Sequence, residues 1–379
     1  MRTYPDPPVT FVRGEGSWLF DLEGRKYLDF LCGLAVTSIG HCHPEVERAL
    51  CHQAGTLVHV SNLFANLIGP EVATTLDGLI GGGGRVFFTN SGAEANECAV
   101  KLVRKWAGPG RFAVVSTYGS FHGRTLATLA ATGQPDKHEP FQPLPEGFRL
   151  VAWDDIDQLD AALDPSVVAG VLLEVIQGEG GVNQLSPGYL RELRSVCDEK
   201  GIALILDEVQ TGLGRTGEWF AFQHAGITPD VVTVAKALGN GVPIGACWAL
   251  EEVADAFVPG DHGSTFGGQP LASAAARATL RVMQKEDVPA RAAKSGTRLM
   301  QGLEAIPGID YVKGQGLLLG AVLEDGDRPN RAKAVAERAL SLGLVVNAVR
   351  PDTLRLAPSL LVSHDEIDLG LSILAEALV

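Results

Sequence analysis

The sequence predicts an α/β protein in which a mostly parallel central sheet is covered by helices. In the middle of the chain, apolar runs of strand length alternate with segments that have helical periodicity. Apolar runs without polar alternation are typical of strands buried on both faces, as in parallel sheets. Both ends of the chain carry different patterns, which predict a small α+β domain built from the two termini.

Five apolar runs predict the strands of the central sheet, and two helical patterns lie between them. In sheets of this type, ligands bind at the carboxyl ends of the strands. Polar side chains at those ends are therefore the first candidates for a functional site. The expected strands span residues 85–89, 112–116, 168–174, 203–207 and 231–235, and the expected helices span residues 93–106 and 192–200.

The flanks predict the second domain. Short strand patterns occur at residues 18–20 and 27–30, and a long alanine-rich helical stretch follows Pro270. A strand at 316–323, a helix at 332–342 and a strand–helix pair from Leu354 onward complete it. We expect residues 1–48 and 271–379 to form the small domain and residues 49–270 the large one.

Composition narrows the class of function. The chain has 379 residues, 46% of them hydrophobic, which is enough for a large core. Lys and Arg total 31 against 45 Asp and Glu, and this net charge of −14 argues against a nucleic-acid partner. No apolar signal core or membrane-spanning stretch is present, and the six cysteines form no CxxC pair. We expect a cytoplasmic protein that acts on small molecules and uses no metal.

An anion site is expected where the strand at 85–89 meets the next helix. Ser91, Gly92 and Ala93 stand at the start of that helix, where the first backbone amides have no partner within the helix. These amides and the helix dipole suit a phosphate monoester. An ordinary serine cap with a tight turn is the alternative for this segment alone.

A carboxylate and an amine end two of the expected strands. Asp207 closes the run 203–206, and Lys236 follows the run 231–235. Such an aspartate can bind a pyridinium nitrogen, and a buried lysine loses its proton more easily and attacks a carbonyl. Taken separately, Asp207 also fits a metal ligand or an ion pair, and Lys236 also fits a surface lysine. Their order on one sheet, after the anion site, favours a pyridoxal phosphate enzyme.

The segment after the strand at 112–116 adds two further candidates. Phe121 is placed to stack on a planar cofactor, and Arg124 is placed to bind a substrate carboxylate through two parallel hydrogen bonds. A loop phenylalanine in the core and a solvated arginine are the alternatives.

Two other segments match known binding motifs only in part. Residues 212–217 match GxGxxG, but four residues separate them from the preceding strand and no helical pattern follows. A dinucleotide-binding loop starts at the strand end and opens a helix, so an NAD(P)-dependent oxidoreductase is a distant alternative. His41, Cys42 and His43 resemble metal ligands, but they lack zinc spacing.

Eight short motifs, in order along nearly the whole chain, carry a resemblance to a known family. They are Gly40-His41-Cys42-His43-Pro44, Ser91-Gly92-Ala93-Glu94-Ala95-Asn96-Glu97, Phe121-His122-Gly123-Arg124-Thr125, Gln177-Gly178-Glu179-Gly180-Gly181, Asp207-Glu208-Val209-Gln210-Thr211-Gly212, Lys236-Ala237-Leu238, His262-Gly263-Ser264-Thr265-Phe266-Gly267-Gly268 and Arg355-Leu356-Ala357-Pro358. The chain resembles the class III aminotransferases of the ornithine and γ-aminobutyrate type, and most of all their acetylornithine branch. These enzymes use pyridoxal 5′-phosphate on the fold of type I transferases.

The resemblance implies a set of cofactor-binding residues. Lys236 is similar to the lysine that holds the cofactor as a Schiff base and then moves a proton between substrate and cofactor. Asp207 is similar to the partner of the pyridine nitrogen. The remaining implied cofactor-binding residues are Ser91, Gly92 and Ala93 at the phosphate, Phe121 and Val209 on the two faces of the ring, Gln210 at the phenolic oxygen, and Glu208 next to Asp207.

The resemblance also implies a homodimer with shared active sites. Thr265 is similar to a phosphate ligand that the other subunit contributes, with Ser264 beside it near the substrate. Arg124 is similar to a substrate-carboxylate clamp. Arg355 is similar to a second clamp for the α-carboxylate of glutamate, and Glu179 would mask it when the amine donor has no carboxylate there.

Substrate choice is expected from one apolar residue. Enzymes of this family that act on free ornithine carry a tyrosine shortly before the Gly-His-Cys-His-Pro motif, where this chain has Leu34. An apolar contact suits an acylated nitrogen better than an ammonium group. We expect transfer of the δ-amino group of N-acetyl-L-ornithine to 2-oxoglutarate, in arginine biosynthesis. Ornithine, succinylornithine and γ-aminobutyrate remain alternative amine donors.

Overall fold

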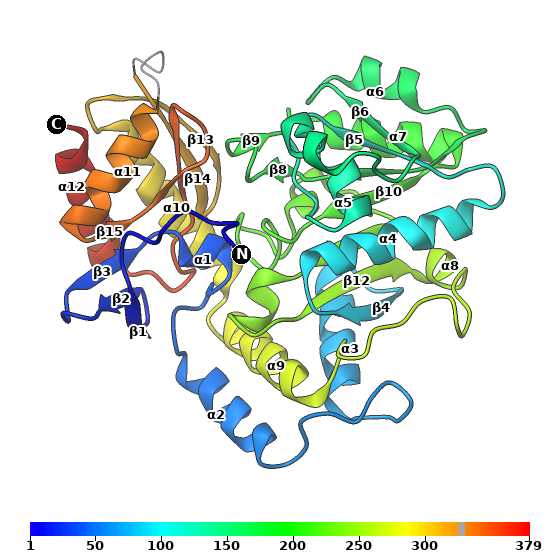
Figure 1. The fold of residues 1–379 in the computed structure, drawn as a ribbon, viewed down its shortest axis with the longest axis horizontal. Coiled ribbons are helices and arrows are strands. Elements are labelled where there is room, and N and C mark those ends of the chain that lie inside the picture. Colours follow the sequence, from blue (N-terminus) through cyan, green and yellow to red (C-terminus); the bar gives the residue numbers. More distant parts are fainter. Residues whose placement is uncertain (325–329) are drawn as a thin grey trace.

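A seven-stranded sheet forms the centre of the larger of two lobes in the computed structural model, which describes residues 1–324 and 330–379 (Figure 1). Six of its strands run in one direction, and β12 runs against both of its neighbours. In spatial order the strands are β4 (Gly84–Thr89), β12 (Gly245–Leu250), β11 (Val231–Val234), β10 (Ala203–Asp207), β7 (Val168–Leu173), β5 (Ala113–Thr117) and β6 (Phe148–Val151).

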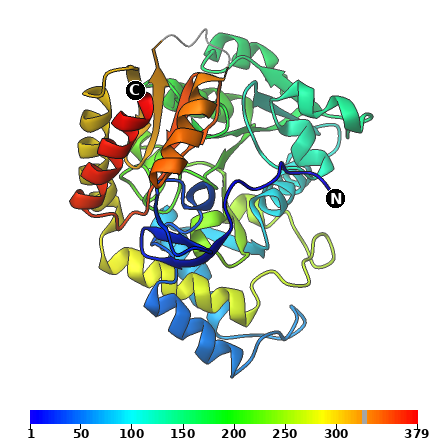
Figure 2. The same cartoon turned by 60° about the vertical axis from the view of Figure 1, so that its left-hand side comes forward.

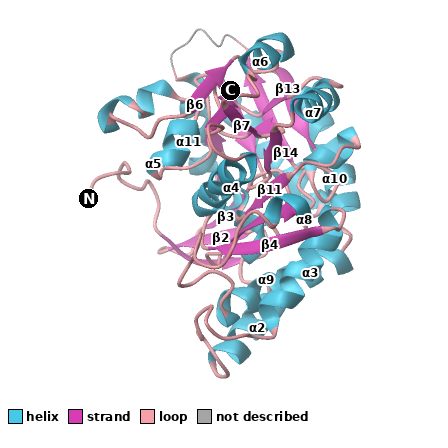
Figure 3. Cartoon of the chain, turned by 90° about the vertical axis from the view of Figure 1, so that its right-hand side faces the viewer, coloured by secondary structure: helices cyan, strands magenta, loops and turns pink. Residues whose placement is uncertain are grey.

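Helices cover both faces of this sheet (Figure 3). Side chains alternate between the faces along each strand. In β10, Ala203 and Ile205 pack in one core cluster with α4, while Leu204 and Leu206 pack in another with α3 and α7. The uninterrupted apolar strands are thus buried from both sides. The helices of this lobe are α3 (Ile68–Ile80), α4 (Gly92–Ala107), α5 (Leu126–Ala131), α6 (Ile156–Ala162), α7 (Tyr189–Lys200), α8 (Glu251–Ala254) and α9 (Pro270–Lys285).

The second lobe contains two four-stranded sheets and joins the two ends of the chain. One sheet has the order β13 (Ile309–Gln315), β14 (Leu318–Leu323), β17 (Thr353–Leu356), β16 (Asn347–Ala348), and all its pairs are antiparallel. The other has the order β1 (Phe11–Glu15), β2 (Trp18–Asp21), β3 (Lys26–Asp29), β15 (Leu344–Val345). The helices beside them are α10 (Val288–Glu304), α11 (Arg331–Leu342) and α12 (His364–Leu378).

The parallel pair of β3 and β15 joins segments from opposite ends of the chain. Figure 2 shows the blue N-terminal strands lying against the orange and red C-terminal segments. Helix α2 (Pro44–Ala54) packs on α9, which begins at the expected last residue of the large domain. The limits at residues 48 and 270 remain a prediction.

The predicted α/β class is confirmed, and the predicted strands of the central sheet all occur. Strands β6 and β12 were not expected. Strand β12 follows the glycine-rich turn at residues 239–245 and lies between β4 and β11. Its apolar pattern does not indicate that it runs antiparallel to both of them. None of the helices in the described part of the chain has the length and apolar character that crossing a membrane requires.

The GxGxxG-like segment and His41 both form contacts that stabilise the fold. The glycine-rich segment at 212–217 opens no α-helix, and its Arg215 is buried and donates hydrogen bonds to Leu317 O at 3.1 Å and Ser38 Oγ at 2.9 Å. The segment therefore joins the two lobes. His41 Nε2 contacts Asp29 Oδ2 at 2.8 Å. No group of three metal-ligating side chains is found among the residues that the structure describes.

Candidate active site

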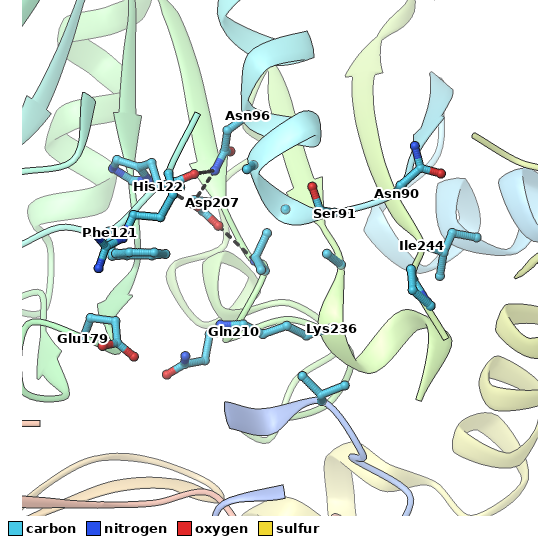
Figure 4. Close-up of a pocket in the computed structure, with 18 of the residues that line it drawn as sticks. Asn90, Ser91, Asn96, Phe121, His122, Glu179, Asp207, Gln210, Lys236 and Ile244 are labelled. Carbon is cyan, nitrogen blue, oxygen red and sulfur yellow. Dashed lines mark hydrogen bonds and ion pairs between the residues drawn. The ribbon is translucent and has the colours of Figure 1, made fainter. Parts of the chain in front are cut away.

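A cavity of about 410 Å³ opens at the carboxyl ends of the central strands (Figure 4). It is lined by Asp207 at the end of β10 and by residues of the segments that follow β4, β5, β7, β10 and β11. The site therefore lies where the sheet rule places it. Ten of the predicted residues line it, namely Ser91, Gly92, Ala93, Phe121, Arg124, Glu179, Asp207, Val209, Gln210 and Lys236.

One end of the cavity is the N-terminus of α4. Ser91 caps this 16-residue helix, and its Oγ accepts a hydrogen bond from Glu94 N at 3.2 Å. A Cβ added to Gly92 would lie 2.9 Å from Cγ1 of Val209, so only glycine lets Val209 come this close to the helix start. Free amides and the positive end of the helix dipole meet the cavity here, which makes this end suitable for a phosphate.

Asp207 is held in one orientation by a buried network at the end of β10. Its Oδ2 accepts hydrogen bonds from Asn96 Nδ2 at 2.8 Å and from His122 Nδ1 at 2.9 Å, as Figure 4 shows. Asn96 Oδ1 in turn accepts from Thr233 Oγ1 at 2.7 Å. All four side chains are buried. The network leaves the carboxylate facing the cavity with a fixed direction.

Lys236 follows β11 and opens the short 3₁₀ helix η4 (Lys236–Gly239). Its φ of 41° is in the left-handed region, which is uncommon for a residue with a side chain and is found at functional sites. Burial lowers the pKa of the Lys236 ammonium, and the guanidinium of Arg355 lowers it further. The amine therefore loses its proton more readily than a surface lysine.

Glu174 was missed, although it directly follows the apolar strand β7, much as Asp207 closes β10. Its Oε2 accepts a hydrogen bond from Phe121 N at 2.9 Å, and its Oε1 accepts one from Gly178 N at 3.3 Å. One carboxyl thus holds the two loops that carry Phe121 and Glu179. Burial raises the pKa of Glu174 to about 7, and the nearby Asp207 adds to the rise.

Arg355 of β17 reaches the cavity region from the second lobe. Its Nη1 lies 2.8 Å from Glu179 Oε1 and donates to Gln210 Oε1 at 3.3 Å, and its Nε donates to Asn347 Oδ1 at 3.1 Å. Arg355 is 1% exposed, and its Nη2 is buried with no hydrogen-bond partner in the described part of the chain. Burial acts to raise the pKa of Glu179, but Arg355 outweighs it and holds that pKa below its usual value. The predicted Glu179–Arg355 pair is therefore present as an ion pair.

Besides Arg355, four predicted residues do not line the cavity of the single chain. Glu208 is buried behind β10, where it accepts from Thr211 Oγ1 and from Phe222 N. Leu34 is 39% exposed in α1 (Cys32–Ala35), and Val36, two residues later, lines the cavity instead.

Ser264 and Thr265 line a separate hollow on the other side of Asn90. Asn90 joins the two hollows, because it lines both and its Nδ2 donates to Ser264 Oγ at 3.2 Å.

Sequence reasoning gave no role to Asn96 and His122, although a signal for Asn96 was present. Asn96 lies four residues after Gly92 on α4, so helical spacing puts both on the face toward the cavity. His122 follows Phe121 in the segment Phe121-His122-Gly123-Arg124-Thr125, and its buried Nε2 has no partner among the described residues.

The side chains around the cavity fit pyridoxal phosphate. The start of α4 can hold the phosphate, Phe121 and Val209 border the space for a planar ring, and Asp207 can hold a protonated pyridine nitrogen. Lys236 lines the same cavity with a lowered pKa. The phosphate, the pyridine nitrogen and the carbonyl of this cofactor thus each have a suitable partner among the lining residues.

Comparisons with known proteins agree with this geometry. Residues 2–378 match the family Aminotransferase class-III. The chain is 48% identical over 370 residues to the acetylornithine aminotransferase of Mycolicibacterium smegmatis, covering 97% of this chain and 93% of that protein.

Two solved structures are similar over nearly their whole length. The ornithine aminotransferase from Toxoplasma gondii ME49 has a TM-score of 0.95 at 35% identity, covering 100% of this chain and 92% of that one. The N-acetylornithine aminotransferase from Stenotrophomonas maltophilia K279a has a TM-score of 0.86 at 38% identity, covering 99% of this chain and 96% of that one. The chain therefore belongs to the class III aminotransferases, and its cofactor is pyridoxal phosphate.

Proposed function

We propose that this enzyme transfers the δ-amino group of N-acetyl-L-ornithine to 2-oxoglutarate, giving N-acetyl-L-glutamate 5-semialdehyde and L-glutamate, as a step of arginine biosynthesis. The relatives at 45–48% identity that carry the name acetylornithine aminotransferase support this substrate. The similarity to an ornithine aminotransferase structure keeps ornithine as the second candidate.

The Glu179–Arg355 ion pair is the observation that carries the proposal. The two half-reactions present different groups beside the reacting nitrogen, because glutamate has an α-carboxylate there and a δ-amine has only a methylene. Arg355 is buried at 2.8 Å from Glu179, and Glu179 lines the cavity together with Lys236. If Glu179 turns away, Arg355 is exposed to a carboxylate, and when Glu179 stays, the charge is neutralised. One site can then serve both amines.

The residues of the chain have distinct tasks in this reaction. When bound, pyridoxal phosphate supplies the carbonyl that takes up the amino group and the ring that withdraws electrons from the reacting carbon. Lys236 Nζ accepts and returns the proton of that carbon, a task that its lowered pKa favours. Asp207, fixed by Asn96 and His122, keeps a proton on the pyridine nitrogen. Arg124 lines the cavity and binds the remote carboxylate of the substrate.

We further propose that the enzyme is a homodimer in which Thr265 completes the phosphate site of the partner. Thr265 is exposed and does not line the cavity of its own chain. Large apolar side chains are exposed next to it and in a nearby loop, with Phe266 at 64%, Phe64 at 68% and Leu63 at 87%. Apolar patches of this kind mark protein interfaces. Mixing Lys236→Ala chains with Thr265→Ala chains should restore activity, because the mixed dimer contains one intact site; no recovery would refute the shared site.

Substrate choice and cofactor use can be tested together on the purified enzyme. The kcat/KM with 2-oxoglutarate is measured for N-acetylornithine, ornithine, succinylornithine and γ-aminobutyrate. We expect N-acetylornithine to be preferred, since Val36 and not a hydroxyl lines the cavity near Leu34. Equal rates with free ornithine would contradict the proposed substrate.

A visible absorption band that Lys236→Ala abolishes is expected, whereas a colourless protein that binds NAD would contradict the whole assignment. The cytoplasmic location remains a prediction for cell fractionation.

A further inference from the structure

Three cationic side chains lie around the end of the cavity that Arg124 borders, and we call them the distal cluster: Arg124, Lys137 and Arg350. Arg124 lines the cavity, and Arg350 Nε donates to Gly180 O at 2.8 Å, next to Glu179. Lys137 ends the 3₁₀ helix η1 (Pro135–Lys137) and is half-buried. The cluster thus combines residues from three separate segments, and of the three Arg124 lines the cavity.

Lys137 and Arg124 share one aromatic side chain. The Lys137 Nζ lies 5.4 Å from the centroid of the Phe121 ring, and the Arg124 Cζ lies 5.7 Å from it. Phe121 borders the cofactor space, so both positive groups stand at the same end of the active site. A ring face attracts cations, which holds the two charges near each other despite their repulsion.

The positive charge of the distal cluster is not balanced by the described residues. None of its three members forms an ion pair with a described residue. Lys137 donates to Gln134 Oε1, which is a neutral acceptor. The acid that faces Lys137 is Glu179, and Glu179 is paired with Arg355. One of these cations lines the cavity and the other two lie near it, and such a concentration of positive charge in a chain of net charge −14 calls for an anion.

The electrostatic surroundings of Lys137 agree with this reading. Burial lowers the pKa of its ammonium group, and Arg124 and Arg350 lower it further, while Glu179 acts in the opposite direction. A bound carboxylate would relieve this repulsion, because an opposite charge nearby favours the protonated amine.

We propose that Lys137 is a substrate-binding residue that, beside Arg124, holds the carboxylate remote from the reacting nitrogen and so makes the enzyme select substrates that carry it. This inference rests on the proposed function, in which both N-acetylornithine and 2-oxoglutarate have a carboxylate at that end. Lys137 then adds a second charged donor to the carboxylate in each half-reaction. Amines and oxo acids without the remote carboxylate gain nothing from it.

Two pairs of compounds that differ only by the remote carboxylate test the proposal. N-acetylputrescine is N-acetylornithine without it, and 2-oxobutyrate is 2-oxoglutarate without it. In single-turnover measurements on the holoenzyme, Lys137→Met should lower kcat/KM about tenfold for N-acetylornithine and for 2-oxoglutarate, the effect of one charge-assisted hydrogen bond. The two compounds without the carboxylate should change less than about twofold, and Lys137→Arg should restore most of the loss.

Lys333→Met is the matched control, since it removes the same charge from an exposed position on α11. It should leave all four values unchanged. Equal losses for compounds with and without the carboxylate, or no loss at all, would overturn the role of Lys137. The 2-oxoglutarate pair reports on Lys137 even if N-acetylornithine is not the amine donor, so the two proposals fail separately.

Discussion

Glu208 allows a test of burial that leaves the cavity intact. Its carboxyl group is buried. It accepts one hydrogen bond from Thr211 Oγ1 and a second from Phe222 N at 3.0 Å. Burial raises its pKa to about 7, although both hydrogen bonds act in the other direction. Glu208→Gln keeps the shape and removes the charge. The amide oxygen can accept from Phe222 N, and the amide nitrogen can donate to the Thr211 hydroxyl.

The sign of the effect follows from proton binding. Between pH 4.5, the ordinary pKa, and pH 7 the folded protein keeps the Glu208 proton while the unfolded chain releases it. The contribution of Glu208 to the free energy of unfolding is therefore full below pH 4.5 and is lost as the pH rises to 7. A shift of this size corresponds to about 3 kcal/mol, since each pKa unit corresponds to about 1.4 kcal/mol.

The assay compares the thermal unfolding of the wild type and Glu208→Gln holoenzymes between pH 5 and 8.5. We expect similar melting temperatures at pH 5 and a variant that is several degrees more stable at pH 8, in line with about 3 kcal/mol in a chain of this length. The exposed Glu218→Gln is the control and should follow the wild type. Parallel pH profiles for wild type and Glu208→Gln would refute the argument. A lost cofactor band in Glu208→Gln would instead show that Glu208 contacts the cofactor.

Three further substitutions have expected outcomes. Gly92→Ala places a Cβ 2.9 Å from Cγ1 of Val209, and such overpacking costs about 1–3 kcal/mol. The affinity for the cofactor, measured by spectroscopic titration of the apoenzyme, should fall at least about tenfold. Unchanged affinity would contradict the close approach of Val209 to the helix start. Glu179→Ala leaves the charge of Arg355 without its partner. The ratio of kcat/KM for glutamate to kcat/KM for the distal amine should therefore rise about tenfold, or about 1.4 kcal/mol. An unchanged ratio would refute the proposed masking of Arg355 by Glu179. Glu174→Gln leaves one of two backbone amides without an acceptor. Urea unfolding at pH 5, where its raised pKa keeps Glu174 protonated in the folded protein, should show a loss of about 1–3 kcal/mol, and no loss would contradict the tie between the loops.

The strands of the central sheet could be predicted because their apolar runs are nearly continuous. Strand direction could not be predicted, since β12 is as buried as its neighbour β11 but runs in the opposite direction. Burial fixes which residues are apolar, while direction depends on the connection that precedes the strand.

The candidate site was predictable where a polar residue follows an apolar run. This rule identified Asp207 and Lys236, and it applies equally to Glu174 at the end of β7. Asn96 required a second step, because it lies within α4 and contacts Asp207 instead of following an apolar run. A contact between Leu34 and the substrate stays a prediction. The backbone has positive φ from Cys32 through Ala35, which the apolar pattern does not indicate, and in the single chain this turn brings Val36 to the cavity.

The parallel pairing of β3 with β15 has a consequence for how the chain is made. Leu28 pairs with Leu344, so β3 cannot complete this pairing until almost the whole chain has left the ribosome. At about 5–20 residues per second, this delay is on the order of tens of seconds. During that time one edge of β3 has no partner, and an unpaired edge promotes association with other chains. The nascent chain is therefore expected to depend on chaperones until its last third is complete.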